Sequence, residues 1–288
     1  MNSRMKVIFD DSISNDTVIA WNTTVPLFKE SLFNADKEKR KEIIKKKIID
    51  ILPLLIEKIE EEINSEINEV KVSLASAWVR YYVFKLEVND EHSFALNLLS
   101  PNSPVKSFKN HWEDAVKIYR RFPRNVAKPI AVGNEFLLQE WINGTPISEF
   151  REGDIMVDVE NAKKCIPLVS RFLFELNKFG YVYHPWEDYE VMLRNGDIVL
   201  LDVTRFVKKR LNEEEFIDFY FGVPFCSPDI IKPKKNDSSV RLYWKGVSEK
   251  DYFGTSKKEY IKLFLEGIKS VATEDEFKKI CKGIRKWI

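Results

Sequence analysis

Two hydrophobic periodicities divide the chain, and the first predicts a long helix near the N-terminus. Over residues 36–68 apolar side chains recur at three- and four-residue steps with lysine and glutamate between them, which is typical of an amphipathic helix. The apolar positions are Ile44, Ile48, Ile51, Leu52, Leu55 and Ile59. Pro53 stands among them, and because proline removes a backbone donor we expect it to kink or divide the helix. Residues 1–68 are thus expected to form an N-terminal extension built on a charged helix.

The second periodicity begins at Glu69, where apolar residues alternate with polar ones. The runs 70–74, 78–88 and 94–99 predict three consecutive antiparallel strands, with a turn over 89–92. A helix that ends near Pro123 follows, and then two short strands over 129–132 and 136–141. Residues 69–143 are therefore expected to hold a five-stranded antiparallel sheet with one helix.

Beyond Asn143 the pattern becomes mostly helical. Its long helix is marked by Ile166, Val169, Phe172, Leu173 and Leu176. Gly180 is placed to end that helix, and Asn195-Gly196 predicts a hairpin turn between two small strands. Helices over 260–268 and 276–287 close the chain. Residues 144–288 are expected to form a mainly helical region, which makes the fold class α+β.

Composition and charge exclude several classes of protein but do not indicate a function. A chain of 288 residues with a formal net charge of +1 has no general attraction to nucleic acid or to a membrane surface. The three cysteines are widely spaced, so they predict neither a disulfide framework nor a zinc site. No apolar signal segment begins the sequence and no window approaches a membrane span. We expect a cytoplasmic protein.

Four short segments resemble known sequence motifs. Phe136–Gly144 looks like a fifth strand and hinge, and Gly222–Ile231 looks like the end of an activation segment. Tyr183–Phe206 has the layout of a catalytic loop followed by a metal-binding segment, and Asp251–Gly254 is similar to the start of a lobe-anchoring helix. Taken in their order along the chain, over about 69–267, these segments resemble the protein-kinase-like superfamily.

The resemblance implies a bilobal fold, with the sheet and its helix in an N-lobe over 69–143 and a mainly helical C-lobe over 144–288. It also implies ATP and Mg²⁺ as cofactors, with hinge residues Glu140, Trp141 and Ile142 beside the nucleotide. The sequence leaves open whether a nucleotide binds.

The parts that would hold phosphate depart from the family pattern. The glycine-rich loop corresponds to Leu74–Tyr82, which contains no glycine, so its side chains would crowd a nucleotide. Arg80 within it is an alternative phosphate contact. Neutral Asn97 stands where the family has its phosphate-anchoring lysine, and Glu113 on the next helix would lack its usual partner. Arg80 or Lys85 is a candidate to supply the missing charge.

The catalytic loop departs further. Trp186 falls on the catalytic aspartate and Val191 on the metal-binding asparagine, and neither side chain can do that chemistry. Glu187 and Asp188 lie beside the lost site and are the candidate substitutes. Asp202 alone stands in place as a candidate Mg²⁺ ligand, although it can equally satisfy backbone donors at a strand end.

These substitutions favour a pseudokinase that binds a protein partner or regulates it, through the N-terminal extension or the acidic segment Leu211–Tyr220. An atypical ATP- and Mg²⁺-dependent phosphotransferase that uses Asp202 with Glu187 or Asp188 is the alternative. A third reading is an unrelated α+β interaction protein. The sequence does not predict the oligomeric state.

Overall fold

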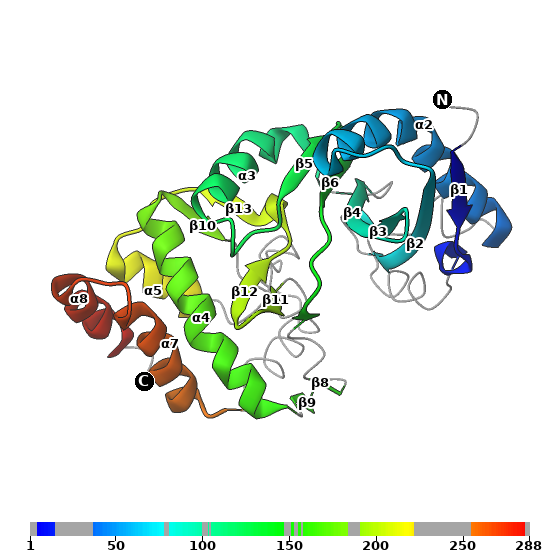
Figure 1. The fold of residues 1–288 in the computed structure, drawn as a ribbon. Coiled ribbons are helices and arrows are strands. Elements are labelled where there is room, and N and C mark those ends of the chain that lie inside the picture. The colour runs from blue at the N-terminus through cyan, green and yellow to red at the C-terminus, as the bar shows by residue number, and fades with distance from the viewer. Residues whose placement is uncertain are drawn as a thin grey trace, which may run out of the picture. The chain divides into compact units, whose positions relative to one another are not determined.

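Helices and strands are both abundant in the computed structural model of the protein (Figure 1), in line with the α+β class expected from the sequence. The described residues are 5–14, 37–77, 81–99, 103, 105–146, 151–152, 155–156, 158–183, 191–221 and 255–285. The chain forms two units, the first from Met1–Arg121 and Ala127–Trp141, the second from Phe122–Val126 and Ile142–Ile288. It therefore enters the second unit twice, and the N-terminal extension belongs to the first unit together with the sheet.

The first unit is built on a six-stranded sheet with the strand order β1-β2-β3-β4-β6-β5. The strands are β1 (Lys6–Phe9), β2 (Glu69–Ala77), β3 (Tyr81–Val88), β4 (His92–Leu99), β5 (Pro129–Val132) and β6 (Phe136–Glu140). All neighbouring pairs are antiparallel except β1 and β2. The expected number of five strands is wrong, because β1 adds a parallel edge strand that the alternating pattern did not reveal.

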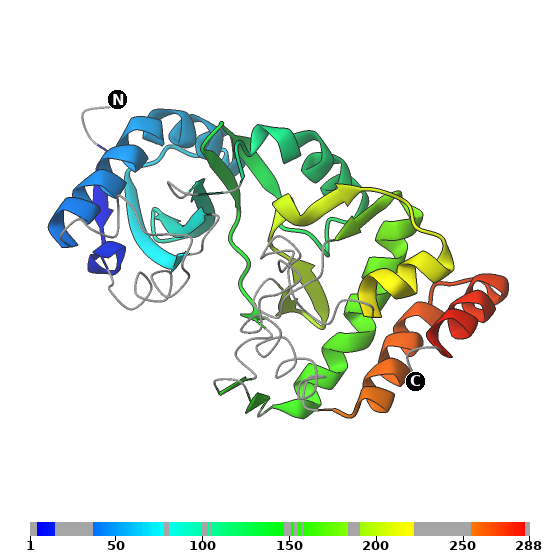
Figure 2. The same cartoon turned by 180° about the vertical axis from the view of Figure 1, so that it is seen from behind.

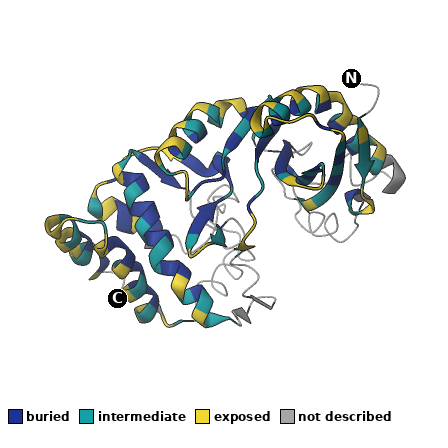
Figure 3. Ribbon diagram, in the orientation of Figure 1, coloured by how far each residue is buried: buried dark blue, intermediate teal, exposed yellow. Residues whose placement is uncertain are grey.

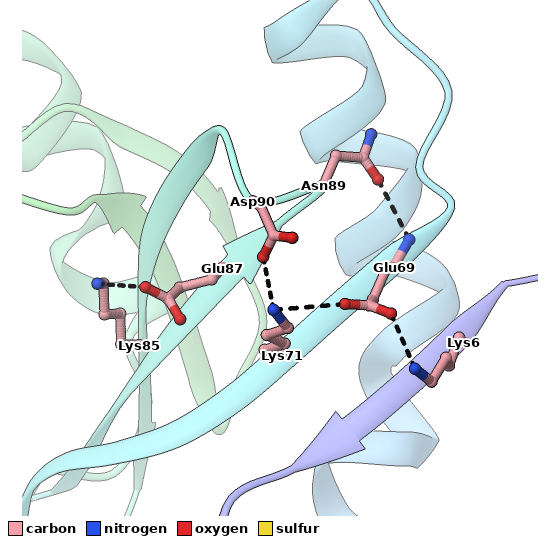
Figure 4. Close-up of polar contacts among 7 residues, drawn as sticks. All are labelled: Lys6, Glu69, Lys71, Lys85, Glu87, Asn89 and Asp90. Atoms are coloured by element: carbon pink, nitrogen blue, oxygen red, sulfur yellow. Dashed lines mark hydrogen bonds and ion pairs between the residues drawn. The ribbon is translucent and has the colours of Figure 1, made fainter.

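Strand β1 is held by both apolar and charged contacts. Val7 and Phe9 pack against the core of the first unit. On the strand's other side, Figure 4 shows charges of alternating sign that run from Lys6 through Glu69 and Lys71 to Asp90, with Lys6 Nζ 3.1 Å from Glu69 and Lys71 Nζ 2.6 Å from Asp90. These pairs are exposed and contribute little energy, but they favour the register in which Lys6 lies opposite Glu69.

The turn between β3 and β4 also fastens the start of β2. Asn89 and Asp90 have φ values of 52° and 59°, the left-handed backbone that a tight hairpin needs and that asparagine and aspartate tolerate. The side-chain oxygen of Asn89 accepts hydrogen bonds from the backbone N–H groups of Asn68 (2.9 Å) and Glu69 (3.2 Å). One turn residue thus connects the β3–β4 hairpin to the start of β2.

Helix α2 (Lys37–Ile63) covers one face of this sheet. Its inward residues are Ile44, Ile48, Leu52, Leu55 and Ile59, all buried, and Figure 3 shows exposed positions alternating with buried ones along it. Pro53 does not divide the helix, which runs through it. A proline costs a helix about 3 kcal/mol, whereas each buried isoleucine or leucine contributes about 1.5–3 kcal/mol. Packing on both sides of Pro53 therefore outweighs the lost hydrogen bond.

Helix α3 (Lys109–Arg121) completes the first unit, with Ala115 and Ile118 on its buried side. It lies between β4 and β5 in sequence, where the pattern predicted a helix. A short 3-10 helix, η1 (Asp11–Ser14), follows β1, and its Ser12 hydroxyl accepts a hydrogen bond from the Leu74 N–H (3.0 Å).

The second unit is mainly helical. It contains α4 (Val159–Lys178), α5 (Glu213–Phe221), α7 (Lys257–Lys269) and α8 (Glu274–Ile284). Figures 1 and 2 show α7 beside α4 and α8 beside α5. Among the described residues, no helix is both long enough and apolar enough to cross a membrane.

Short strands accompany these helices. They are β7 (Thr145–Pro146), β8 (Arg151–Glu152), β9 (Ile155–Met156), β10 (Tyr181–Tyr183), β11 (Val191–Arg194), β12 (Asp197–Leu200) and β13 (Phe206–Lys208). β11 and β12 form the hairpin predicted at Asn195-Gly196, where both turn residues have positive φ. β10 pairs antiparallel with β13, and β7 joins the hairpin at β11.

The acidic segment Leu211–Tyr220 is not an exposed loop. Most of it forms α5, whose Phe216 and Ile217 are fully buried, while only Glu214 and Glu215 of the acidic run are exposed. Leu211 is buried as well, and both of its backbone polar groups bond to the side-chain amide of Asn177. The charges of the first turn concealed the apolar side of this helix in the sequence.

We predict that Gly267→Ala destabilises the second unit. A Cβ atom at Gly267 would lie 2.1 Å from both the Pro167 carbonyl oxygen and the Ser170 hydroxyl of α4, and the backbone atom cannot move aside alone. The free energy of unfolding, measured by urea denaturation, should fall by at least about 2 kcal/mol. Gly283→Ala is the matched control, because its nearest neighbour is at 3.7 Å, and it should gain up to about 1 kcal/mol from helix propensity. Equal losses in both variants would contradict the close contact between α4 and α7.

A second prediction concerns the pH dependence contributed by Glu276. A hydrogen bond from the Thr273 N–H within the capping box, assisted by Lys178, holds the pKa of Glu276 below its usual range. The carboxylate therefore stabilises the fold above the ordinary glutamate pKa, and this contribution is lost as the pH falls through the lowered value. Glu276→Gln keeps a capping acceptor, so its deficit of roughly 0.5–1 kcal/mol at pH 7 should shrink as the pH falls below the ordinary glutamate pKa and vanish below the lowered pKa. A deficit that is constant from pH 3 to pH 7 in urea denaturation would show that charge plays no part.

Candidate functional site

Three of the predicted site residues share one face of the first unit's sheet. In β4, Phe94, Leu96 and Leu98 belong to the core beneath α2, so the alternation of side chains places Asn97 on the opposite face. In β3 the same rule places Lys85 on that face, since Phe84 and Leu86 are in the core. Trp141 joins them, because the Lys85 ammonium lies 5.5 Å from the centre of its ring. We call this side the second sheet face.

Asn97 is the most enclosed of these three residues, with only 5% of its surface exposed. It lies opposite Val83 of β3 and Leu137 of β6, between two hydrogen-bonded strands. An amide in this position offers no net charge, so it cannot neutralise a phosphate as a lysine would.

Lys85 is a diagonal neighbour of Asn97 on the second sheet face, because its own partner in β4 is Ala95. Its ammonium already has two partners: Glu87 Oε1 lies at 2.6 Å, and the Trp141 ring provides a cation–π contact. Figure 4 shows the Lys85 side chain directed toward Glu87. Lys85, the candidate to supply the missing charge, therefore lies on the same sheet face as Asn97, and its ammonium already has partners within the first unit.

Among the other predicted nucleotide contacts that the structure describes, Glu140 and Ile142 do not lie on this face. Glu113 is exposed on α3. Glu140 lies opposite Phe94 and accepts a hydrogen bond from the Lys128 N–H (3.3 Å), which places it on the side of α2. Ile142 is buried in the second unit. Of the three hinge residues, only Trp141 accompanies Asn97.

Asp202 follows β12 in the second unit and caps a short 3-10 helix, η4 (Val203–Arg205). Its Oδ1 accepts hydrogen bonds from the Thr204 N–H (2.8 Å) and the Thr204 hydroxyl (2.7 Å). Its Oδ2 lies 3.5 Å from the Nε of Arg205. The two charged side chains are only 4% and 5% exposed, so they form a buried ion pair three residues apart in sequence.

Neither Thr204 nor Arg205 was identified from the sequence. The threonine two residues after an aspartate is a signal for local capping that was available. The arginine carried a weaker signal, a charged residue within the apolar run Val203–Val207. Periodicity does not indicate which charges are buried together.

The strand that leads to Asp202 is anchored by residues from far earlier in the chain. The Leu200 N–H donates to the Asn125 carbonyl (2.8 Å), and the Asn125 side chain donates to the Ile198 carbonyl (2.9 Å). Nearby, Phe122 packs edge-on against Phe172 and Phe179. The excursion Phe122–Val126 thus fixes β12, and through it the position of Asp202 within the second unit.

Several predicted residues lie outside the described part of the chain. They are Arg80, Trp186, Glu187 and Asp188, together with the segments 222–231 and 251–254. Within the described residues, no group of three or more histidine, cysteine, aspartate or glutamate side chains is arranged to hold a metal ion.

A comparison by sequence gives a relative that matches almost end to end. No protein-family model matches this sequence. An uncharacterized protein of Archaeoglobus fulgidus is 46% identical over 283 residues, which cover 96% of this chain and 95% of that protein. The chain belongs to the same family as this archaeal protein. Since the match extends over nearly the full length, the family includes both units.

Solved structures give weaker likenesses. The Mycobacterium tuberculosis protein Rv3197, solved with erythromycin, matches 47% of this chain with 13% identity and a TM-score of 0.40, and this chain covers 46% of that protein. An ethanolamine kinase of Plasmodium vivax matches 75% of this chain and 71% of its own length, with 9% identity and a TM-score of 0.46. At these TM-scores and identities, neither structure assigns a fold family or a function to this chain.

We predict that burial keeps Cys165 unreactive in the folded second unit. Burial within α4 raises the pKa of its thiol to about 11, so at pH 8 very little thiolate is present. Iodoacetamide should leave the Cys165 peptide unmodified in the native protein and modify it fully in urea, as measured by mass spectrometry. Rapid native modification at pH 8 would show that α4 opens readily.

Proposed function

We propose that this chain is a kinase-like protein without efficient phosphoryl transfer that acts as a protein-binding or regulatory module. The order of elements supports the kinase-like part: three antiparallel strands, a helix, two more strands, and then a helical unit that carries a small hairpin. A net charge of +1 favours neither nucleic acid nor a membrane as partner. The proposal therefore includes a protein partner, and it keeps the cytoplasmic location expected from the sequence.

The single observation that supports the loss of activity is the state of charge on the second sheet face, where Asn97 is neutral and Lys85 is paired with Glu87. Phosphoryl transfer depends on cations placed around the phosphates before the reaction begins. Asn97 contributes none, and the Lys85 ammonium is occupied by Glu87 and Trp141. Because an ammonium has three donors, a phosphate at Lys85 would share this cation with the Glu87 carboxylate, and that carboxylate would repel it.

The second candidate function is an atypical phosphotransferase that uses Asp202 with Glu187 or Asp188. The observation in its favour is the position of Asp202, directly after the β11–β12 hairpin where the resemblance places a metal-binding aspartate. In this candidate, Lys85 or Arg80 would contact the phosphate.

A thermal-stability titration with ATP and ADP, with and without Mg²⁺, separates the two candidates, since any ligand that binds only the folded state raises the melting temperature. We expect no Mg²⁺-dependent shift at millimolar nucleotide and no transfer of labelled phosphate. The phosphotransferase would instead show both, and would lose both in Asp202→Asn while retaining them in Asp197→Asn. Asp197 is the matched control because it is an ion-paired aspartate in β12, the strand that leads to Asp202, and it is bonded to Arg171.

A further prediction tests the role of Lys85 directly. If its ammonium serves the contacts with Glu87 and Trp141, Lys85→Met should leave the nucleotide response unchanged and alter stability only slightly, because Lys85 and Glu87 are both partly exposed. Isothermal titration with ATP makes the comparison. A tenfold loss of affinity in Lys85→Met, absent from Lys71→Met on β2, would assign Lys85 to phosphate binding.

A further inference from the structure

Neighbours from its own segment contact both oxygens of the Asp202 carboxylate. Thr204 donates twice to Oδ1, once from its backbone and once from its hydroxyl, and the Arg205 guanidinium stands beside Oδ2. A carboxylate that caps a helical turn and faces a guanidinium is an arrangement that stabilises local structure.

The charges of this pair cancel within the protein. A buried carboxylate needs an opposite charge close by, because water no longer stabilises it. Arg205 is itself buried, and arginine stays protonated at any ordinary pH. The positive charge beside Asp202 is therefore permanent and is supplied by the chain.

The donor set does not fit Mg²⁺. This ion demands octahedral oxygen ligands and keeps several of its waters, whereas the Asp202 side chain is 4% exposed and its oxygens are already in use. A cation bound at Oδ2 would also stand next to the Arg205 guanidinium, which repels it. Within the described residues no cluster of acidic, histidine or cysteine side chains supplies further ligands.

We propose that Arg205 takes the electrostatic place of a divalent cation beside Asp202, so that Asp202 is a structural carboxylate and the protein does not bind Mg²⁺ through it. The inference deepens the proposed function. It rests on that function only because it takes Asp202 to stand at the position of the family's metal-binding aspartate. In this proposal Arg205 provides the positive charge that balances the Asp202 carboxylate.

Metal binding is tested without nucleotide, by titrating the protein with Mn²⁺ and following the electron paramagnetic resonance signal of the free ion. Mn²⁺ prefers the same oxygen ligands as Mg²⁺. Wild type and Asp202→Asn should give superimposable titrations, whether neither binds the ion or both bind it elsewhere. Binding by wild type that disappears in Asp202→Asn but persists in Asp197→Asn would overturn the proposal.

A second readout needs no variant, in case Asp202→Asn does not fold. Fe²⁺ bound to a protein cleaves the backbone next to its site in the presence of ascorbate and peroxide. We expect no cleavage near Asp202 in the wild-type chain, and a fragment that ends beside Asp202 and is suppressed by excess Mg²⁺ would reject the assignment.

The counter-charge itself is tested by a double-mutant cycle on Asp202→Asn and Arg205→Met, with melting temperature as the readout. Each single variant should lower it by several degrees, because each leaves one buried charge without compensation, and the double variant should be no worse than the poorer single variant. The same cycle on the more exposed pair Asp197–Arg171, 27% and 34% exposed, should show much smaller coupling. Additive losses at Asp202 and Arg205 would contradict the pairing.

These outcomes are separable from failure of the proposed function. Mn²⁺ bound through Asp202 without phosphate transfer would remove the role of Arg205 and leave a kinase-like binding module. Phosphate transfer without a metal at Asp202 would reject the loss of activity and leave the Asp202–Arg205 assignment intact.

Discussion

The burial of one sheet face beneath α2 is the constraint on which the first unit depends. Four buried residues of α2 share one core with the inward side chains of every strand from β2 to β6. Because this packing uses one side of each strand, it determines which side chains occupy the second sheet face. Asn97, Lys85 and Trp141 owe their common side to the same alternation that fills the core.

In the second unit, hydrogen bonds from side chains to backbone position several segments. Asn177 holds both polar groups of Leu211, and the Tyr220 hydroxyl donates to the Tyr183 carbonyl (3.1 Å) and accepts from its N–H (3.3 Å). Burial raises the pKa of Tyr220, so the hydroxyl keeps the proton that this bond needs. Such bonds fix loops and strand ends that are too short to build regular structure of their own.

Much of the fold could be predicted from the sequence because strong periodicity and turn chemistry are local signals. The alternation from Glu69 indicated β2, β3 and β4, and Asn195-Gly196 indicated the β11–β12 hairpin. β1 escaped notice because four residues in a parallel pairing show too little pattern, and α5 because its acidic first turn masked Phe216 and Ile217. At the candidate site, only the resemblance suggested that neutral Asn97 stands in place of a phosphate-anchoring lysine. The partners of Lys85 and Asp202 depend on side-chain directions in three dimensions, which periodicity does not encode.

Because the segment Phe122–Val126 belongs to the second unit, it limits how the protein can be cut into fragments or recombined with a relative. Because these five residues belong to the second unit while their neighbours on both sides belong to the first, no single cut releases either unit intact. A fragment ending at Trp141 would carry Phe122 and Val126 without the side chains and strand they pack on. Exchange of one unit between relatives must therefore occur at three junctions at once, so the two units are expected to be inherited together.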